Sequence, residues 1–300
     1  MMDTKFQIEK RLTFLNLPNI GNAKAKRLST TFETEVDINE FSKILINETG
    51  LNFSEAEINK ANYQAKKTIE ICNEHNIKIL IGEEIPQNLS QYKDSPLVIF
   101  SYGDLPDKNE IIAIIGSRTP SKEGISAAQI ISDYVSINEY IILSGLAIGI
   151  DTIAHQTAVK NNKKTIAVLG SGILNIYPKE NKQLAHEIVE CGGCLVSAYS
   201  PETPVQNFQL IARDKLQARL SNKIILVESK KGGGSMHAMK EAAAINIPSF
   251  SIEYPDCSII NWEGNHELIK SKQSIAINNI GLEKNIALIK NSLNSQDTLF

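Results

Sequence analysis

The feature that most constrains the fold is a change of hydrophobic period near residue 76. Before it, apolar residues such as Phe6, Leu12 and Leu15 recur at helical spacing, and no segment reads as a strand. After it, short apolar runs alternate with longer amphipathic stretches. The runs fall at 77–81, 97–100, 111–115, 141–143, 165–169, 194–197, 224–227 and 249–252. Helices are predicted between most of them, near 121–137, 150–160, 180–190, 206–220 and 235–245.

The runs are apolar throughout, which is typical of parallel strands covered by helices on both faces. We therefore predict an α/β fold, a Rossmann-like doubly wound and mostly parallel sheet with a small N-terminal helical domain. The expected domains are 1–76, helical; 77–255, Rossmann-like; and 256–300, a C-terminal extension in which the pattern weakens before a last helix at 282–293.

Composition excludes several classes of protein. The 42% hydrophobic and 22% charged fractions of the 300 residues are ordinary for a globular chain. Apolar runs such as 111–115 fall far short of the ~20 residues that a membrane span needs. The charged segment 3–10 offers no apolar signal-peptide core. We expect a cytoplasmic protein that does not associate with membranes.

The four cysteines do not form a disulfide framework. Cys191 and Cys194 form one C-G-G-C, which supplies only two of the four ligands of a structural zinc ion. The pair also falls where a helix should turn into a buried strand. We therefore expect no metal and no cofactor.

Glycine and serine follow four of the predicted strands. In an open parallel sheet, ligands bind beyond the carboxyl ends of the strands, where backbone amides and helix N-termini suit phosphate groups. The residues at these ends are Gly116, Ser117, Arg118, Ser144, Gly145, Ala147, Gly149, Asp151, Gly170, Gly172, Gly234 and Ser235. The sequence thus predicts a phosphate-binding rim. The alternative, that glycine merely permits tight turns, explains each loop singly but not the recurring serines.

The predicted rim has a basic segment beside it, although the net charge of the whole chain is −3. Between 205 and 231 there are six basic residues against two acidic ones. Arg213 and Lys215 lie in this segment, and Arg118 directly follows a buried strand. All three are candidate phosphate contacts. For Lys223 and Lys230, a solvated helix face is an equally good explanation.

Three blocks of the sequence resemble the DNA-processing protein A (DprA, or Smf) family. They are Ala113–Arg118, Ser144–Asp151 with His155 following, and Thr165–Gly172 followed by Tyr177-Pro178 and Asn181. Their order and spacing match, so the resemblance covers about 95–255. It implies a single-stranded-DNA-binding protein that forms a homodimer, protects incoming strands and passes them to the RecA recombinase in natural transformation, with no established catalysis. It also adds Asn181 to the expected DNA contacts.

The segment Leu17–Gly21 with Lys24 is similar to a helix-hairpin-helix turn, whose amides and lysines contact phosphate without reading sequence. Gly21 and Lys24 are therefore candidates for a secondary DNA contact. A plain hairpin of two helices is the equal alternative.

Two of the departures from the family pattern make the predicted rim less positive. Ile148 stands where the family has an arginine, and Asp214 separates two basic residues where the family has an asparagine. Each change should weaken phosphate binding by about 1–3 kcal/mol if the contact is direct.

These departures keep two other functions open. One is a nucleotide sensor or a phosphoribohydrolase-like enzyme, for which Asp151, His155 and Glu228 would form the polar cluster. Asp151 and His155 share a helix face, and that spacing suits a structural hydrogen bond better than an acid–base pair. The other is an interaction module that no longer binds a ligand.

Overall fold

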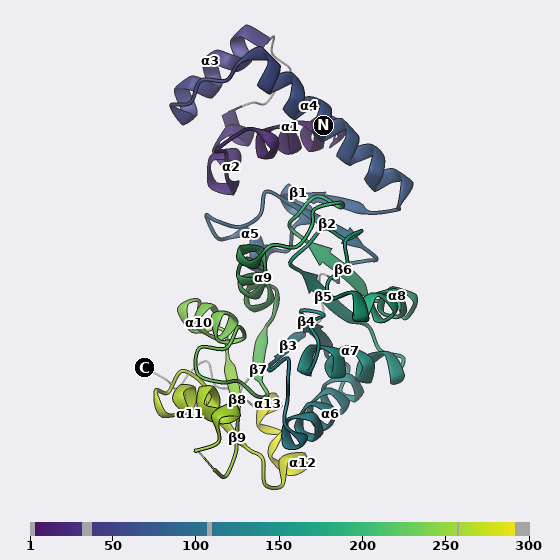
Figure 1. Ribbon diagram of the computed structural model, residues 1–300, viewed down its shortest axis with the longest axis vertical. Coiled ribbons are helices and arrows are strands. Elements are labelled where there is room, and N and C mark those ends of the chain that lie inside the picture. Colours follow the sequence, from purple (N-terminus) through teal and green to yellow (C-terminus); the bar gives the residue numbers. More distant parts are fainter. Residues whose placement is uncertain (1–3, 32–37, 107–109, 257, 292–300) are drawn as a thin grey trace. The chain divides into compact units, whose positions relative to one another are not determined.

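The computed structural model describes residues 4–31, 38–106, 110–256 and 258–291 (Figure 1). The chain divides into two compact units, Met1–Ser101 and Tyr102–Phe300. No helix among the described residues is both long and apolar enough to cross a membrane.

The first unit opens with four helices, α1 (Thr4–Asn16), α2 (Asn22–Thr31), α3 (Ile38–Thr49) and α4 (Glu55–Glu74). Helix α4 begins at a capping box, in which the Glu57 amide donates to Ser54 Oγ (3.3 Å) and the Ser54 amide donates to Glu57 Oε2 (2.9 Å). Strand β1 (Lys78–Ile81), the short α5 (Gln87–Ser90) and β2 (Val98–Tyr102) follow, and β1 and β2 pair antiparallel.

The first unit extends past the expected boundary at residue 76. The helical stretch ends at Glu74, close to that position. Lys26 of α2, however, donates through Nζ to the carbonyl oxygens of Ser90 (3.0 Å) and Tyr92 (3.2 Å). These bonds hold the 77–101 segment on the helices, so the two compact units divide at residue 101.

The second unit is built on seven parallel strands. They are β3 (Ile111–Ile115), β4 (Ile141–Ser144), β5 (Thr165–Leu169), β6 (Cys194–Ser197), β7 (Lys223–Leu226), β8 (Ser249–Glu253) and β9 (Ile275–Asn278). Their order in the sheet is β6-β5-β4-β3-β7-β8-β9. The chain thus runs outward from β3 in one direction and from β7 in the other, which makes the β3–β7 pair the topological switch point.

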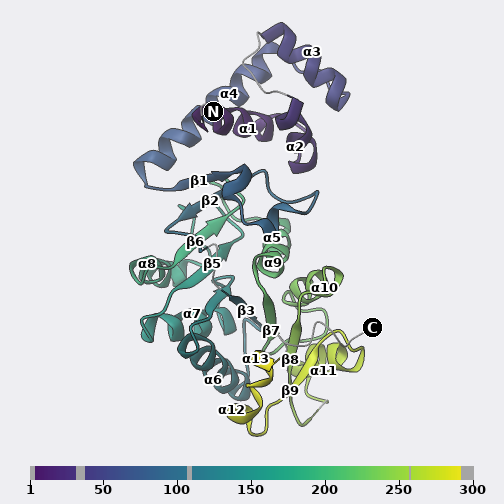
Figure 2. The same ribbon diagram turned by 180° about the vertical axis from the view of Figure 1, so that it is seen from behind.

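Helices cover both faces of this sheet. On one face lie α6 (Lys122–Ile137), α7 (Ile150–Lys160) and α8 (Lys182–Glu190); on the other lie α9 (Asn207–Leu220), α10 (Met236–Ala244) and α11 (Glu263–Lys270) (Figures 1 and 2). Right-handed crossovers require this separation, because the two halves of the sheet grow in opposite directions. Ile112, Ile114, Ile142 and Ile225 are fully buried between the layers. The predicted doubly wound, mostly parallel α/β fold is confirmed.

The described part of 256–300 belongs to the second unit rather than standing apart from it. Strand β9, which the sequence pattern did not predict, pairs with β8 through Ile275 opposite Phe250. A single helix was expected at 282–293, but the described residues form two short helices, α12 (Leu282–Asn285) and α13 (Leu288–Asn291). Residues 292 and 293 lie outside the described part of the chain. The buried Lys223 fastens α13 to the sheet by donating from Nζ to the Ile289 carbonyl oxygen (2.7 Å).

Candidate functional site

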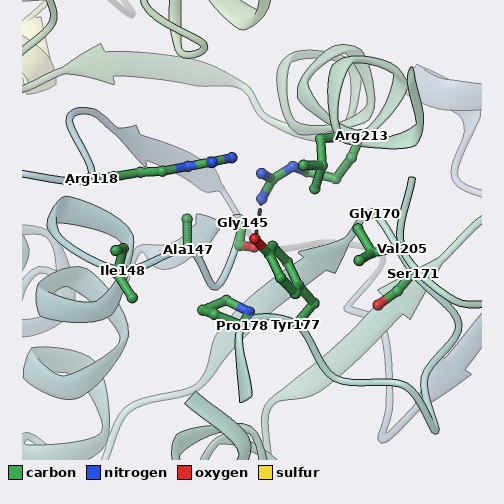
Figure 3. A pocket seen from close by; sticks show the side chains of 11 residues that line it. Arg118, Gly145, Ala147, Ile148, Gly170, Ser171, Tyr177, Pro178, Val205 and Arg213 are labelled. Atoms are coloured by element: carbon green, nitrogen blue, oxygen red, sulfur yellow. Dashed lines mark hydrogen bonds between the residues drawn. The ribbon is translucent and has the colours of Figure 1, made fainter. Parts of the chain in front are cut away.

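A cavity of about 60 Å³ lies at the carboxyl ends of β3, β4 and β5 (Figure 3). This is the edge where the sequence places the phosphate-binding rim. The lining residues come from the loops after these strands, from α9 and from the segment that leads into it. They are Arg118, Gly145, Ala147, Ile148, Gly170, Ser171, Tyr177, Pro178, Val205, Leu210 and Arg213.

The loop after β4 folds around the buried carboxylate of Asp151. Its Oδ2 accepts hydrogen bonds from the Gly145 and Ala147 amides, each at 3.2 Å. Burial raises the pKa of Asp151, while the nearby Arg213 guanidinium and these two amides oppose the rise. The sequence predicts backbone amides at this loop that are free to bind phosphate. The amides of Gly145 and Ala147 instead donate to Asp151, so this expectation is corrected for these two.

Arg213 closes one side of the cavity and is almost completely buried, with 5% of its surface exposed. Its Nη1 donates to the Gly145 carbonyl oxygen (2.5 Å) and lies 3.8 Å from Asp151 Oδ2. A Cβ atom at residue 145 would lie 1.4 Å from this Nη1. The glycine is therefore required here so that the arginine can approach the backbone.

Arg118 approaches the cavity from the opposite side and is exposed. Figure 3 shows its guanidinium group directed toward that of Arg213, above Gly145 and Ala147. The carboxylates of Asp151 and Asp214 lie beside Arg213, whereas no ion pair to Arg118 occurs among the described residues. Two cations that face each other over a small cavity favour an anion between them.

Asp214 is the acidic neighbour of this arginine pair. Its Oδ1 lies 3.1 Å from Arg213 Nε. Burial raises the pKa of Asp214 to about 6, although Arg213 acts in the opposite direction. Lys215 is half exposed on the outer face of α9, with its Nζ 3.9 Å from Glu241 Oε2.

Several predicted contact residues are buried and hold the loops in place. The Ser144 hydroxyl donates to the Ile114 carbonyl oxygen (2.6 Å), and Asn181 Nδ2 donates to the Leu146 carbonyl oxygen (2.8 Å). The Gly172 amide donates to the Thr203 carbonyl oxygen (2.8 Å). These polar atoms thus have partners within the protein, and their contact with DNA stays a prediction.

Two other predicted glycines allow close packing at the start of α7. A Cβ atom at Gly116 would lie 2.7 Å from Ile150 Cγ1. Gly149 has a φ of +85°, and a Cβ atom there would lie 2.3 Å from the Ser117 carbonyl oxygen. The Ser117 hydroxyl accepts from the Thr119 amide (3.1 Å).

The other half of the carboxyl edge, beyond β7, is closed by the segment around α11. Asn265 donates to the Val227 and Ile252 carbonyl oxygens (2.9 and 3.0 Å) and accepts from the Ser229 amide (2.9 Å). Trp262 stacks on Tyr254 with the ring centroids 4.5 Å apart. The sequence predicts Gly234 and Ser235 on the same rim, but neither residue lines the cavity. Ser235 Oγ instead donates to Ser229 Oγ (3.0 Å).

The polar residues proposed for an enzyme each have a structural partner instead. His155 Nδ1 lies 2.8 Å from Thr165 Oγ1, and burial lowers the pKa of His155 to about 3. The carboxylate of Glu228 accepts from the Ser121 amide (3.0 Å) and from Trp262 Nε1 (3.2 Å). The cavity is also far smaller than the roughly 300–1,000 Å³ of a usual small-molecule site. This arrangement disfavours the nucleotide enzyme.

Sequence reasoning missed part of the cavity wall. Tyr177 and Pro178 were visible as part of a family block, but not as lining residues. Ser171 sits between two predicted glycines, and only its position there could have indicated it. Val205 and Leu210 carry no chemical signal, because their contribution depends on where α9 packs.

In the first unit, the predicted hairpin joins α1 to α2 through Leu17–Gly21. Asn19 adopts a φ of +59°, and the Gly21 carbonyl oxygen accepts from the Ala25 amide (3.0 Å). Gly21 is exposed and Lys24 is half-buried. Their contact with DNA stays a prediction.

Comparison with known proteins connects this chain to one family. A sequence profile described as DNA recombination-mediator protein A matches residues 76–284. The DNA processing protein DprA of Streptococcus pneumoniae is 37% identical over 174 residues, which cover 58% of this chain and 61% of the relative. For two other relatives, Smf of Borreliella burgdorferi and DprA of Bacillus subtilis, the matched part is 51% and 52% of their length. The chain therefore spans half to three fifths of the length of these curated relatives.

Two solved structures are also similar. The X-ray structure of Streptococcus pneumoniae DprA aligns with a TM-score of 0.75 and 25% identity, over 97% of this chain and 99% of that one. DNA processing protein A from Helicobacter pylori, described for its unique single-stranded DNA binding mode, aligns with a TM-score of 0.64 and 25% identity. That alignment covers 72% of this chain and 96% of the Helicobacter chain.

Proposed function

Because the chain belongs to the DNA recombination-mediator protein A family, we propose that it binds single-stranded DNA at the cavity beyond β3, β4 and β5. The observation that carries this proposal is the pair of guanidinium groups, Arg118 and Arg213, directed toward each other over the cavity. A cavity of about 60 Å³ has room for a phosphate group and a few waters. Binding of the Helicobacter relative to single-stranded DNA supports the same ligand.

The two arginines have different roles in this proposal. Arg213 is fixed by Gly145 and Asp214, so it offers a preorganised edge of positive charge. Arg118 is exposed and supplies the direct contact that an incoming phosphate can reach. The exposed Lys215 would contact the next part of the strand, and Gly21 and Lys24 of the first unit are proposed as the secondary contact.

The wider role is proposed on the family resemblance. The protein would act in the cytoplasm as a homodimer, protect incoming strands during natural transformation, and assist their transfer to a RecA recombinase. A pull-down of purified RecA, with and without a bound strand, tests the partner. If a resin that carries the protein retains no more RecA than a control resin without it, the proposed partner is contradicted.

The DNA contact is tested by fluorescence anisotropy with a labelled oligothymidylate of about 30 nucleotides, at about 50 and about 200 mM salt. We expect salt-sensitive binding that Arg118→Ala weakens by about tenfold, with a smaller dependence of affinity on salt because one phosphate contact is lost. Lys160→Ala is the matched control, since Lys160 is exposed at the far end of α7. An absence of wild-type binding at low salt, or equal losses in both variants, would refute the proposal.

The melting temperature measured with a panel of mononucleotides distinguishes a nucleotide-binding protein from a protein that binds single-stranded DNA. A preformed mononucleotide site would raise the melting temperature, and the shift would grow with the logarithm of ligand concentration above the dissociation constant. We expect no shift with mononucleotides and a clear shift with the oligonucleotide.

A further inference from the structure

Three polar residues outside the cavity form a hydrogen-bonded network that the proposed DNA contact does not use. They are Ser121, which caps the start of α6; Glu228, just after β7; and Trp262, at the end of a short 3-10 helix before α11. Glu228 is completely buried, with 0% of its surface exposed. A buried carboxyl group is costly unless hydrogen bonds satisfy it, so the partners of Glu228 show what it holds in place.

Glu228 accepts hydrogen bonds from two separate segments. The Ser121 amide donates to both carboxylate oxygens, at 3.0 Å to Oε1 and 3.2 Å to Oε2, and the Ser121 hydroxyl also donates to Oε2. Trp262, the only tryptophan in the chain, donates from Nε1 to Oε2 (3.2 Å). Its ring stacks on Tyr254, whose hydroxyl donates to the Val227 carbonyl oxygen (3.0 Å). One carboxylate therefore joins the start of α6 to the segment before α11.

The loop that carries Arg118 ends at this network. It spans 116–121, between β3 and α6. Its first half is held by α7, because the Ile150 amide donates to the Ser117 carbonyl oxygen (3.1 Å). Its last residue is held by Glu228. The backbone at Arg118 thus lies between two fixed supports, although the side chain itself is exposed.

We propose that Glu228 is a positioning residue for the phosphate contact of Arg118. This inference rests on the proposed function and deepens it. A guanidinium group binds phosphate in a defined planar geometry, so a displacement of about 1 Å lowers affinity even when the arginine is present. Glu228 is too deeply buried to touch a strand, and its effect passes through Ser121. Trp262 fixes the carboxylate in turn, so the segment before α11 also influences the DNA contact.

The experiment is a double-mutant cycle of Glu228→Gln and Arg118→Ala, with affinity for oligothymidylate measured by anisotropy. Glutamine keeps the shape of the side chain but replaces one acceptor oxygen with a donor, so part of the hydrogen bonding is lost. Glu228→Gln alone should weaken binding about threefold to tenfold, at most as much as Arg118→Ala, and should cause no further loss in the Arg118→Ala protein. An equal loss in both backgrounds would overturn the inference, because Glu228 would then not act through this arginine. If Glu228→Gln does not fold, the half-buried Ser121→Ala takes its place in the cycle, with the same expectation.

Trp262→Phe and Tyr254→Phe form a matched pair. Each variant removes one hydrogen-bond donor from the same two stacked rings, but only Trp262 donates to Glu228. We expect Trp262→Phe to weaken binding of the strand severalfold and Tyr254→Phe to bind as the wild type does. Equal losses in the two variants would overturn the role of Trp262, since they would report a general loosening of this region.

Hydrogen exchange measures the loop without DNA. The Ser121 amide is bonded to Glu228, and the Gly124 amide donates to Ser121 Oγ (3.0 Å). Both amides should exchange severalfold faster in Glu228→Gln than in the wild type or in Tyr254→Phe. Unchanged exchange in Glu228→Gln would overturn the inference while leaving the phosphate contact intact. Failure of the wild type to bind the strand would instead refute the proposed function, whatever the exchange rates are.

Discussion

The buried acid behind the arginine pair gives the sharpest prediction. Asp214 is only 12% exposed at its side chain, lies 3.1 Å from Arg213 Nε, and has its pKa raised by burial to about 6. A raised pKa means that the folded state binds the proton more tightly than the unfolded state. The contribution of this proton to the free energy of unfolding is therefore complete below pH 3.8 and is lost as the pH rises through about 6. The difference between these two values corresponds to about 3 kcal/mol as an upper limit.

Asp214→Asn removes this loss, because an amide does not ionise. The variant should exceed the wild type in free energy of unfolding by up to about 3 kcal/mol near pH 8, and the two should converge near pH 4. Chemical denaturation at a series of pH values measures both curves. Groups other than Asp214 titrate in both proteins, so the difference between the curves isolates this carboxyl.

The same substitution should also strengthen DNA binding. A carboxylate about 8 Å from a bound phosphate, at an effective dielectric constant of about 20, repels it by about 2 kcal/mol, or up to about thirtyfold in affinity at low salt. The gain should be largest above pH 7 and vanish below about pH 5, where wild-type Asp214 is neutral. If the two proteins show the same affinity and the same pH response, Asp214 does not act on the anion site and the electrostatic reasoning fails.

Three further predictions concern the loops around the cavity. Ile148→Arg should raise affinity for single-stranded DNA about tenfold, with a steeper salt dependence, as measured by anisotropy; an unchanged salt dependence would contradict a phosphate path past this residue. Gly145→Ala should displace Arg213, because the new Cβ would lie 1.4 Å from Nη1; DNA affinity should fall about tenfold or more, and affinity equal to that of the wild type would show that the arginine is not fixed by this loop. Asn265→Ala should lower the free energy of unfolding by about 3 kcal/mol, since buried carbonyls of Val227 and Ile252 lose their donor. A loss below about 0.5 kcal/mol, within the range of an ordinary surface substitution, would refute that role.

The strands were the most predictable part of the fold. The runs at 111–115, 165–169 and 194–197 coincide with β3, β5 and β6. Such segments combine β-branched residues with glycine or serine at their ends, and both signals act locally. Strand β9 was missed because Ile275–Asn278 is short and flanked by polar residues, and only its pairing with β8 makes it a strand.

The site was predictable in location but not in its internal hydrogen bonds. The carboxyl edge follows from topology, and topology follows from the alternation of strands and helices. The sequence could not show that Asp151 occupies the amides of Gly145 and Ala147, or that Asn265 closes the edge beyond β7. These contacts decide which amides remain free, and each depends on the placement of a polar side chain by tertiary packing.

The two departures from the family pattern act by different physical routes, and this difference can be measured. Ile148 is exposed at the mouth of the cavity, so it changes what a phosphate or base touches directly. Asp214 is buried behind Arg213, so it acts through its charge and only when it is ionised. The effects of Ile148→Arg and Asp214→Asn on DNA affinity should therefore add within about 0.5 kcal/mol near pH 8. Near pH 5 the double variant should match Ile148→Arg alone. Strong coupling at both pH values would mean that the two residues act on one shared contact, and the separation between direct and electrostatic routes would be wrong.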